Sequence, residues 1–191
     1  MAARLVLSAL IGYPLGAIPF ALLVGRLLAV DPRERGERNP GAWNLWRLGG
    51  VRAGLATFAL DAGKGALAAG AGTALAGWWG GALAGLAAMA GHAWPPWTGF
   101  HGGGRAVATF MGTAAVLAPL ASLIALAVMA VAAAPLGILR AVALGTIAYP
   151  AAFASLTPDP RRLVPLGFAY LLLLVRVLQR RRQNASPAAP G

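Results

Sequence analysis

The sequence predicts an all-α membrane protein whose chain crosses the bilayer several times. Hydrophobic residues make up 59% of its 191 residues and charged residues only 11%, and the mean hydropathy is +0.70. No soluble core of this size needs so much apolar surface. The 16 Lys and Arg residues, against 5 Asp and Glu, stand mostly in loops between apolar runs, where basic residues report orientation in the membrane. We therefore expect membrane lipid, and no nucleic acid, as a partner.

Seven apolar runs are candidate transmembrane helices, and they cover residues 5–30, 51–74, 79–98, 106–120, 121–138, 141–156 and 163–178. Several are shorter than the roughly 20 residues that a helix needs to cross a bilayer. We therefore expect some helices to be broken or to lie inside the bundle. The first run carries only Arg4 ahead of its apolar residues and has no small-residue cleavage site, which predicts a retained helix and not a signal peptide.

The basic residues predict which loops share a side of the membrane. With the N-terminus outside, the cytoplasmic loops would carry Arg33, Arg35, Arg38, Arg47, Arg105, Arg140 and Arg180 to Arg182. The outer side would hold Arg4, Arg161 and Arg162, which is the bias that membrane proteins show. We expect one domain of seven transmembrane helices over residues 1–182, with a cytoplasmic C-terminus, followed by a disordered tail over residues 183–191.

The chain has no cysteine and two histidines. Without cysteine it can form no disulfide, thiolate nucleophile or thiolate metal site, and two histidines give no basis for a metal cluster. We expect neither a metal nor a cofactor.

Residues 91–109 form a glycine-rich, cationic segment. The three consecutive glycines of 102–104 would let backbone N–H groups converge, Arg105 adds a cation, and the apolar run that follows can begin a helix whose positive end faces the same place. Such a turn suits a phosphate group. A flexible connection between two membrane helices explains the same glycines equally well.

Residues 36–47 form a second polar segment. It combines Asn39 and Asn44 with a Pro-Gly turn and Arg47, and amide and guanidinium groups can bind phosphate oxygens. Trp43 and Trp46 suit the headgroup level of a membrane. The alternative is an ordinary basic loop with an aromatic anchor.

Asp61 and Lys64 lie inside an apolar run, three positions apart, on one face of a helix. Charges at membrane depth are costly and face a partner or a polar cavity. The pair either neutralises itself for structural reasons, or Lys64 adds charge to an anion site that Asp61 helps to orient.

These segments resemble a known family. The motifs Asn39-Pro-Gly-Ala-x-Asn-x-x-Arg47, Leu60-Asp-x-x-Lys-Gly65 and Gly91-His-x-Trp-Pro95, the last followed by Gly-Gly-x-Arg-x-Val-Ala-Thr109, are similar in order and spacing to those of the bacterial acyl-phosphate:glycerol-3-phosphate acyltransferases, the PlsY family. The resemblance implies a seven-helix enzyme of the inner membrane with its active site at the cytoplasmic face.

The implied reaction is the first step of phospholipid synthesis. A fatty acyl group would pass from acyl phosphate to the sn-1 hydroxyl of glycerol 3-phosphate, giving lysophosphatidic acid and phosphate. The donor is already an activated anhydride, so no protein nucleophile is needed. Catalysis would depend on positioning two anions and stabilising the developing oxyanion, and a substrate phosphate would be available to take the hydroxyl proton.

The resemblance also assigns roles to individual residues. The catalytic residues would be Arg105, which stands where the family has lysine, together with Lys64 and Arg47. The substrate-binding residues would be Asn39, Gly41, Asn44, His92, Gly102, Gly103, Gly104 and Arg140. A histidine that only satisfies a backbone carbonyl at a helix end is an equal alternative for His92.

The chain departs from the family pattern at several positions. Glu37 and Arg38 replace a Ser-Gly pair, one extra residue separates His92 from Arg105, and the family's C-terminal pattern is absent from residues 174–181. A carboxylate near phosphates is unfavourable unless it is paired, so we expect Glu37 to face solvent or to pair with an arginine. Two other functions therefore stay open: a catalytically degenerate relative that binds an anionic lipid or regulates a true acyltransferase, and a small anion transporter.

Overall fold

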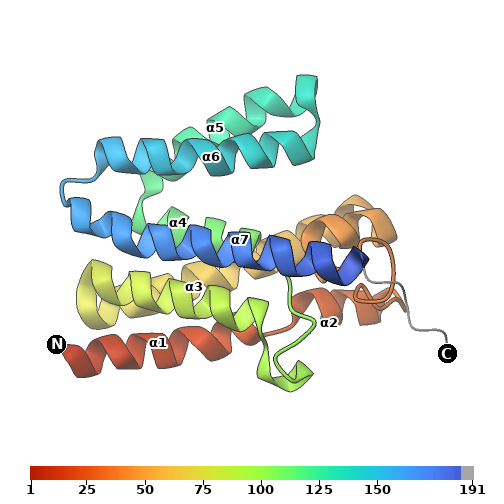
Figure 1. The fold of residues 1–191 in the computed structure, drawn as a ribbon, viewed down its shortest axis with the longest axis horizontal. Helices are drawn as coiled ribbons and strands as arrows, with labels where there is room; N and C mark the ends of the chain where they lie inside the picture. The colour runs from red at the N-terminus through yellow and green to blue at the C-terminus, as the bar shows by residue number, and fades with distance from the viewer. Residues whose placement is uncertain (186–191) are drawn as a thin grey trace.

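The computed structural model describes residues 1–185, and every regular element within them is helical (Figure 1). The helices are α1 (Ala2–Ala17), α2 (Phe20–Leu27), α3 (Ala42–Ala93), α4 (Val107–Leu117), α5 (Pro119–Leu136), α6 (Ile138–Leu156) and α7 (Leu163–Ala185), with short 3₁₀ turns at Pro96–Thr98 and Pro160–Arg162. Since α7 continues to Ala185, residues 183–185 of the predicted disordered tail are helical. Residues 186–191 of that tail lie outside the described residues.

Five stretches within residues 1–185 are long and apolar enough to cross a membrane. They are Ala2–Leu27, Ala42–Thr98, Pro119–Leu136, Ile138–Leu156 and Pro160–Arg182. The shorter apolar helix α4 lies between the second and the third of these. The prediction of a helical, multi-pass membrane protein is therefore confirmed at this level.

The second stretch, α3, is a hairpin and not one straight helix. Its backbone leaves helical geometry at Ala76 and Gly77, where Gly77 has a φ of 63°. Beyond this point the chain folds back on itself. The two arms lie so close together that a side chain added at Gly72 would overlap the backbone of Gly80. The predicted spans 51–74 and 79–98 are the two arms of this hairpin.

Two boundaries differ from the sequence prediction. The run 5–30 is not one helix, because it breaks at Ile18 and Pro19, whose backbone angles are not helical. The segment 31–50, expected to be a loop, becomes helical at Ala42. There Leu45 is fully buried and packs with residues of α2 and of the next turns of α3, and this tertiary contact outweighs the segment's polar composition. Gly50, at a φ of 79°, then kinks the helix.

Small residues let the helices approach closely. Any side chain at Gly12 of α1 would overlap the backbone at Ala84, and one at Gly112 of α4 would overlap the backbone at Ala62. Close backbone contact of this kind is how helices associate in membranes, where burial of apolar surface from water gives no driving force. The arms of α3 are thereby packed between α1 and α4.

The helices α5 and α6 form a pair to one side of the other helices (Figure 1). Aromatic rings connect this pair to the rest: Phe110 of α4 meets Tyr149 of α6 and Tyr170 of α7 edge to face, with ring centroids 5.4 Å apart in each case. Residues of α3, α4, α5 and α6 also line the larger of the two cavities described below.

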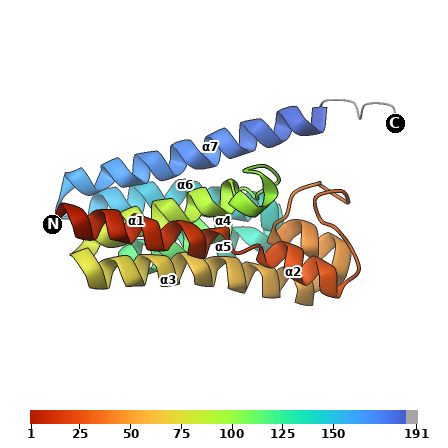
Figure 2. The same ribbon diagram turned by 90° about the horizontal axis from the view of Figure 1, so that it is seen from below.

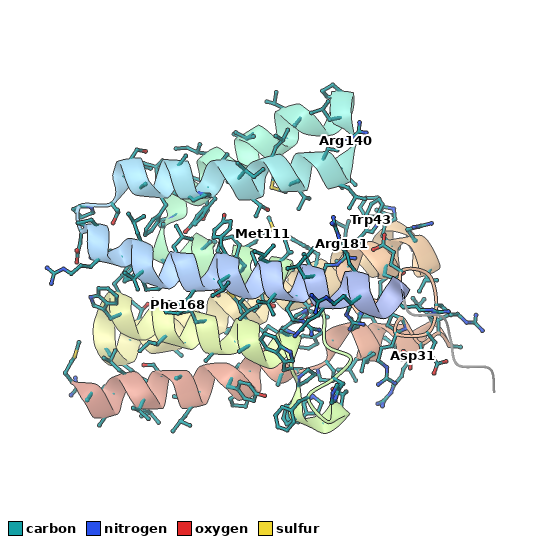
Figure 3. All side chains as sticks on the ribbon, viewed as in Figure 1. Asp31, Trp43, Met111, Arg140, Phe168 and Arg181 are labelled. Carbon is teal, nitrogen blue, oxygen red and sulfur yellow. The ribbon has the colours of Figure 1, made fainter. Side chains whose placement is uncertain are left out.

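One end of the bundle gathers most of the polar loops. Figure 3 shows Asp31, Trp43, Arg140 and Arg181 at this end, whereas the N-terminus and the connection between α6 and α7 lie at the other (Figures 1 and 2). The loops that the arginine pattern predicts to share one side of the membrane therefore lie at one end of the molecule.

Candidate functional site

A cavity of about 350 Å³ lies at the polar end of the bundle. One part of its wall is polar and comes from Asn39, Asp61, His92 and Arg105. Another part is apolar and comes from Met111, Met129, Ile138, Leu139 and Val142. A site of this kind can hold an anionic group and an attached hydrocarbon chain at the same time.

A buried ionic cluster stands behind the polar wall. Lys64 Nζ lies 2.7 Å from Asp61 Oδ1, and both side chains are only 2% exposed. His92 Nδ1 lies 3.5 Å from the same carboxylate oxygen. Lys64 also donates a hydrogen bond of 3.0 Å to the carbonyl of Ile18 at the break between α1 and α2. Because Asp61 compensates its charge, Lys64 can stay ionised at this depth.

The cluster lies beside two cavities, and the predicted site residues do not all line the same one. Asp61 and His92 line the 350 Å³ cavity, but Lys64 does not. Lys64 faces a much smaller cavity of about 20 Å³ on the other side, which residues 102–104 also line. Lys64 is therefore positioned to act on the large cavity through Asp61 rather than by direct contact.

The two asparagines of the 36–47 segment differ in environment. Asn44 is fully buried; its Oδ1 accepts from the backbone N–H of Glu37 at 2.9 Å, and its Nδ2 donates to the carbonyls of Pro32 and Arg35. It holds the loop in shape and does not line the large cavity. Asn39 is 7% exposed and lines the cavity, and its buried Oδ1 has no hydrogen-bond partner in the described part of the chain. Asn39 is thus the amide available to a ligand.

Glu37 lies between two arginines that the sequence assigns to phosphate binding. Its Oε1 is 3.7 Å from Nη1 of Arg47, and its Oε2 is 3.5 Å from Nη2 of Arg105. The carboxylate is thus paired, one of the two arrangements expected from the sequence. It is placed to compete with any anionic ligand for the same guanidinium groups.

At the start of this loop, Arg33 donates side-chain hydrogen bonds to Asp31, which lowers the pKa of the Asp31 carboxyl below its usual value. Asp31 therefore stays ionised throughout the neutral pH range.

The glycine turn approaches the cluster closely. A side chain at Gly104 would overlap the His92 ring and the carbonyl of Pro40, and the Gly104 N–H donates to the His92 carbonyl at 3.2 Å. Gly102 adopts a φ of 72°, in the left-handed region. Residues 102–104 do not line the large cavity, whereas Arg105 and the first turn of α4 do. The groups of this segment that face a ligand are therefore Arg105 and the positive end of α4.

The remaining assigned residues lie at the cavity's edges. Gly41 lines it. Arg140 is exposed near the polar end (Figure 3) and is not part of the wall, although its neighbours Leu139 and Val142 are. Arg47 is more than half exposed and reaches the site through Glu37.

Sequence reasoning missed two residues of α7. Arg176 and Arg180 are buried, and both donate hydrogen bonds to the carbonyls of the glycine turn. The family's C-terminal pattern is absent here, so the resemblance gave no indication of their role. A signal was nevertheless present, since Arg176 interrupts the apolar run 163–178 and a charge within such a run points to a functional contact.

Comparison with known proteins identifies relatives that match most of the chain. The family model described as glycerol-3-phosphate acyltransferase matches residues 6–189. A protein of that name from Symbiobacterium thermophilum is 43% identical over 145 residues, which cover 76% of this chain and 71% of that protein. Another, from Anaeromyxobacter dehalogenans, is 40% identical over 183 residues, or 91% of this chain and 88% of that protein.

Two solved structures are also similar to this chain. The crystal structure of PlsY (YgiH), described as an integral membrane glycerol 3-phosphate acyltransferase in its glycerol 3-phosphate form, superposes with a TM-score of 0.79 at 28% identity. The match covers 94% of this chain and 89% of that one. The lysophosphatidic acid form of the same protein gives a TM-score of 0.76.

Proposed function

The chain belongs to the glycerol-3-phosphate acyltransferase family, the family of PlsY, and we propose that it transfers a fatty acyl group from acyl phosphate to the sn-1 hydroxyl of glycerol 3-phosphate. The products would be lysophosphatidic acid and inorganic phosphate. The observation that carries this proposal is the two-part wall of the 350 Å³ cavity. An acyl phosphate is an anion joined to a long apolar chain, and glycerol 3-phosphate is a second small anion that must reach the same place.

Each part of the cavity suits one part of the substrates. Arg105 and the positive end of α4 would bind the phosphate groups. The unpartnered amide oxygen of Asn39 would accept a hydrogen bond from a glycerol hydroxyl. The apolar wall of Met111, Met129 and Leu139 would receive the first part of the acyl chain.

The chemistry requires little more than this arrangement. The attacking hydroxyl oxygen would form a bond to the acyl carbon while the bond from that carbon to the phosphate oxygen breaks, and the hydroxyl proton would pass to a substrate phosphate. Arg105 would stabilise the negative charge that develops on the leaving phosphate. Within the described residues, the wall of this cavity includes no serine, threonine or cysteine, so the hydroxyl and thiol side chains that most often form acyl-enzymes are not available there.

The proposed location is the bacterial inner membrane, with the active site at the cytoplasmic face. The N-terminus would lie outside, and seven membrane-embedded helical segments would result from counting the two arms of α3 separately and including the short α4. The concentration of arginines at the end that holds the cavity supports this orientation.

The direct test uses the purified protein in phospholipid vesicles with palmitoyl phosphate and glycerol 3-phosphate. We expect phosphate and 1-palmitoyl lysophosphatidic acid to appear in equal amounts, and no product when palmitoyl-CoA replaces the acyl phosphate. Binding of palmitoyl phosphate without phosphate release would instead indicate a degenerate relative. Passage of phosphate across the vesicle membrane without acyl transfer would indicate a transporter.

A further inference from the structure

Two buried cations stand in the C-terminal half of α7. Arg176 and Arg180 are 3% and 6% exposed as whole residues. Neither has an acidic side chain within ion-pair distance among the residues the structure describes. Burying an arginine without a carboxylate partner is costly. The N–H donors of these guanidinium groups must therefore find other hydrogen-bond acceptors.

Backbone carbonyls of the glycine turn receive these donors. Arg176 donates from Nε to the carbonyl of Gly104 at 3.1 Å and from Nη2 to the carbonyl of Gly103 at 2.6 Å. Arg180 donates from Nη2 to the same Gly103 carbonyl. One guanidinium thus holds two consecutive peptide groups, and a second guanidinium holds one of them again.

The contacts also reach the other predicted phosphate-binding segment. Nη1 of Arg180 donates to the carbonyl of Arg38 at 3.0 Å, directly before Asn39. The guanidinium of Arg176 lies 5.2 Å from the centre of the Trp94 ring, at the end of α3. Both ribbon views show the C-terminal end of α7 beside the loop between α2 and α3 (Figures 1 and 2). The end of α7 therefore connects three segments that meet at the cavity.

The turn needs an external restraint of this kind. Consecutive glycines have more backbone freedom than any other residues, and Arg105 follows them directly. Without the two guanidinium groups the position of Arg105 would vary, and a displacement of about 1 Å in a positioning group can reduce a rate by about a hundredfold.

We propose that Arg176 and Arg180 are positioning residues that clamp the Gly102–Arg105 turn to the Arg38–Asn39 segment and so fix Arg105 against the acyl phosphate. Arg176 fixes the turn itself, and Arg180 fixes the distance between the turn and the segment. The kinetic part of this proposal rests on the proposed function, but the geometric part does not.

A distance measurement tests the geometric part without any assay of activity. The chain has no cysteine, so spin labels can be attached after Glu34→Cys and Phe100→Cys, both at exposed positions. We expect a narrow distribution of label distances in the otherwise unchanged protein and a clearly broader one after Arg180→Met. Arg182→Met is the matched control, because Arg182 is exposed on the same helix, and it should leave the distribution narrow. Equal distributions in all three proteins would overturn the clamp.

Kinetics test the positioning role. Arg176→Met should lower kcat/KM for palmitoyl phosphate by about tenfold or more, while KM for glycerol 3-phosphate changes by less than about threefold. Arg180→Met should raise KM for glycerol 3-phosphate as well, because it also releases the Arg38 carbonyl. Arg182→Met should have neither effect.

Lysine replacements guard against a variant that merely fails to fold. Arg176→Lys keeps the charge but cannot hold two carbonyls in the planar arrangement of a guanidinium, so we expect partial loss of kcat and an intermediate width of the label distribution. If Arg176→Lys matches the unchanged protein in both, charge alone suffices and the clamp is wrong. If the unchanged protein has no acyltransferase activity, the proposed function fails, and the label distances still decide the clamp.

Discussion

Glu37 pairs with both Arg47 and Arg105, so in the proposed reaction it would compete with substrate for them, and its removal should improve substrate binding. The variant of choice is Glu37→Gln, which keeps the size of the side chain and removes its charge. In the unchanged protein the two guanidinium groups lie 3.7 Å and 3.5 Å from the carboxylate. A substrate phosphate that binds them must first displace this carboxylate, or share them with it.

The distances and exposures set the size of the effect. The side chains of Arg47 and Arg105 are 59% and 36% exposed, so solvent screens both pairs, and each pair is worth about 0.5–1 kcal/mol. Together they oppose substrate by about 1–2 kcal/mol, a factor of about 5–30 in affinity. We expect Glu37→Gln to lower KM for glycerol 3-phosphate by about fivefold or more, with kcat changed by less than about twofold.

The assay is phosphate release from palmitoyl phosphate in vesicles, with glycerol 3-phosphate varied. Glu34→Gln is the matched control, because Glu34 is an exposed glutamate in the same loop, and it should leave KM unchanged. Raising the salt concentration should shrink the difference between Glu37→Gln and the unchanged protein, since screening weakens the competing pairs. A fall in kcat of about a hundredfold or more with KM unchanged would refute this reasoning and identify Glu37 as a general base.

Three further outcomes follow from the site and the bundle. Arg105→Ala should lower kcat by about 10²–10³-fold, whereas Arg161→Ala, at the opposite end of the molecule, should leave phosphate release unchanged; equal losses would indicate damage to folding. Cysteines placed singly at Phe100 and Arg161 should react with a membrane-impermeant maleimide from opposite sides of the membrane, and labelling of both from one side would contradict the proposed orientation. Met129→Trp, in the apolar wall, should reduce kcat/KM for palmitoyl phosphate relative to lauroyl phosphate by about tenfold, while Leu123→Trp, on the outer face of the same helix, should leave the ratio unchanged.

The sequence predicts the apolar architecture well, because lipid imposes strict rules on it. Helix length, the cost of membrane-depth charge and the location of arginines are all readable from one chain. The hairpin arms of α3 and the buried pair of Asp61 and Lys64 agree with the sequence prediction for this reason. The helix that begins at Ala42 does not, because its stability comes from the contacts of Leu45 with α2 and not from its composition.

Individual roles within the site are harder to predict, because they depend on which way a side chain turns. Asn39 and Asn44 have the same chemistry and lie five positions apart. Asn39 nevertheless faces the cavity, whereas the side chain of Asn44 makes its hydrogen bonds to the backbone of the loop. The role of the glycines at residues 102–104 is equally hard to predict from the sequence. Their spacing indicates a phosphate cradle, but Gly103 and Gly104 lack side chains because His92 and the backbone at Ala93 approach them closely, and Gly102 adopts a positive φ.

The distribution of charge explains how the polar end of the cavity can accommodate a carboxylate, where the family resemblance leads us to expect a hydroxyl. Glu37 reduces the positive potential of Arg47 and Arg105, and the ionic pair of Asp61 and Lys64 contributes no net charge. The two buried arginines of α7 have no such compensation in the described residues, and carbonyl dipoles leave their charge intact. They stand behind the turn that carries Arg105, in a low-dielectric region where a charge acts over a longer range than in water. The polar end of the cavity therefore remains positive, and an anion that displaces Glu37 still enters a favourable field.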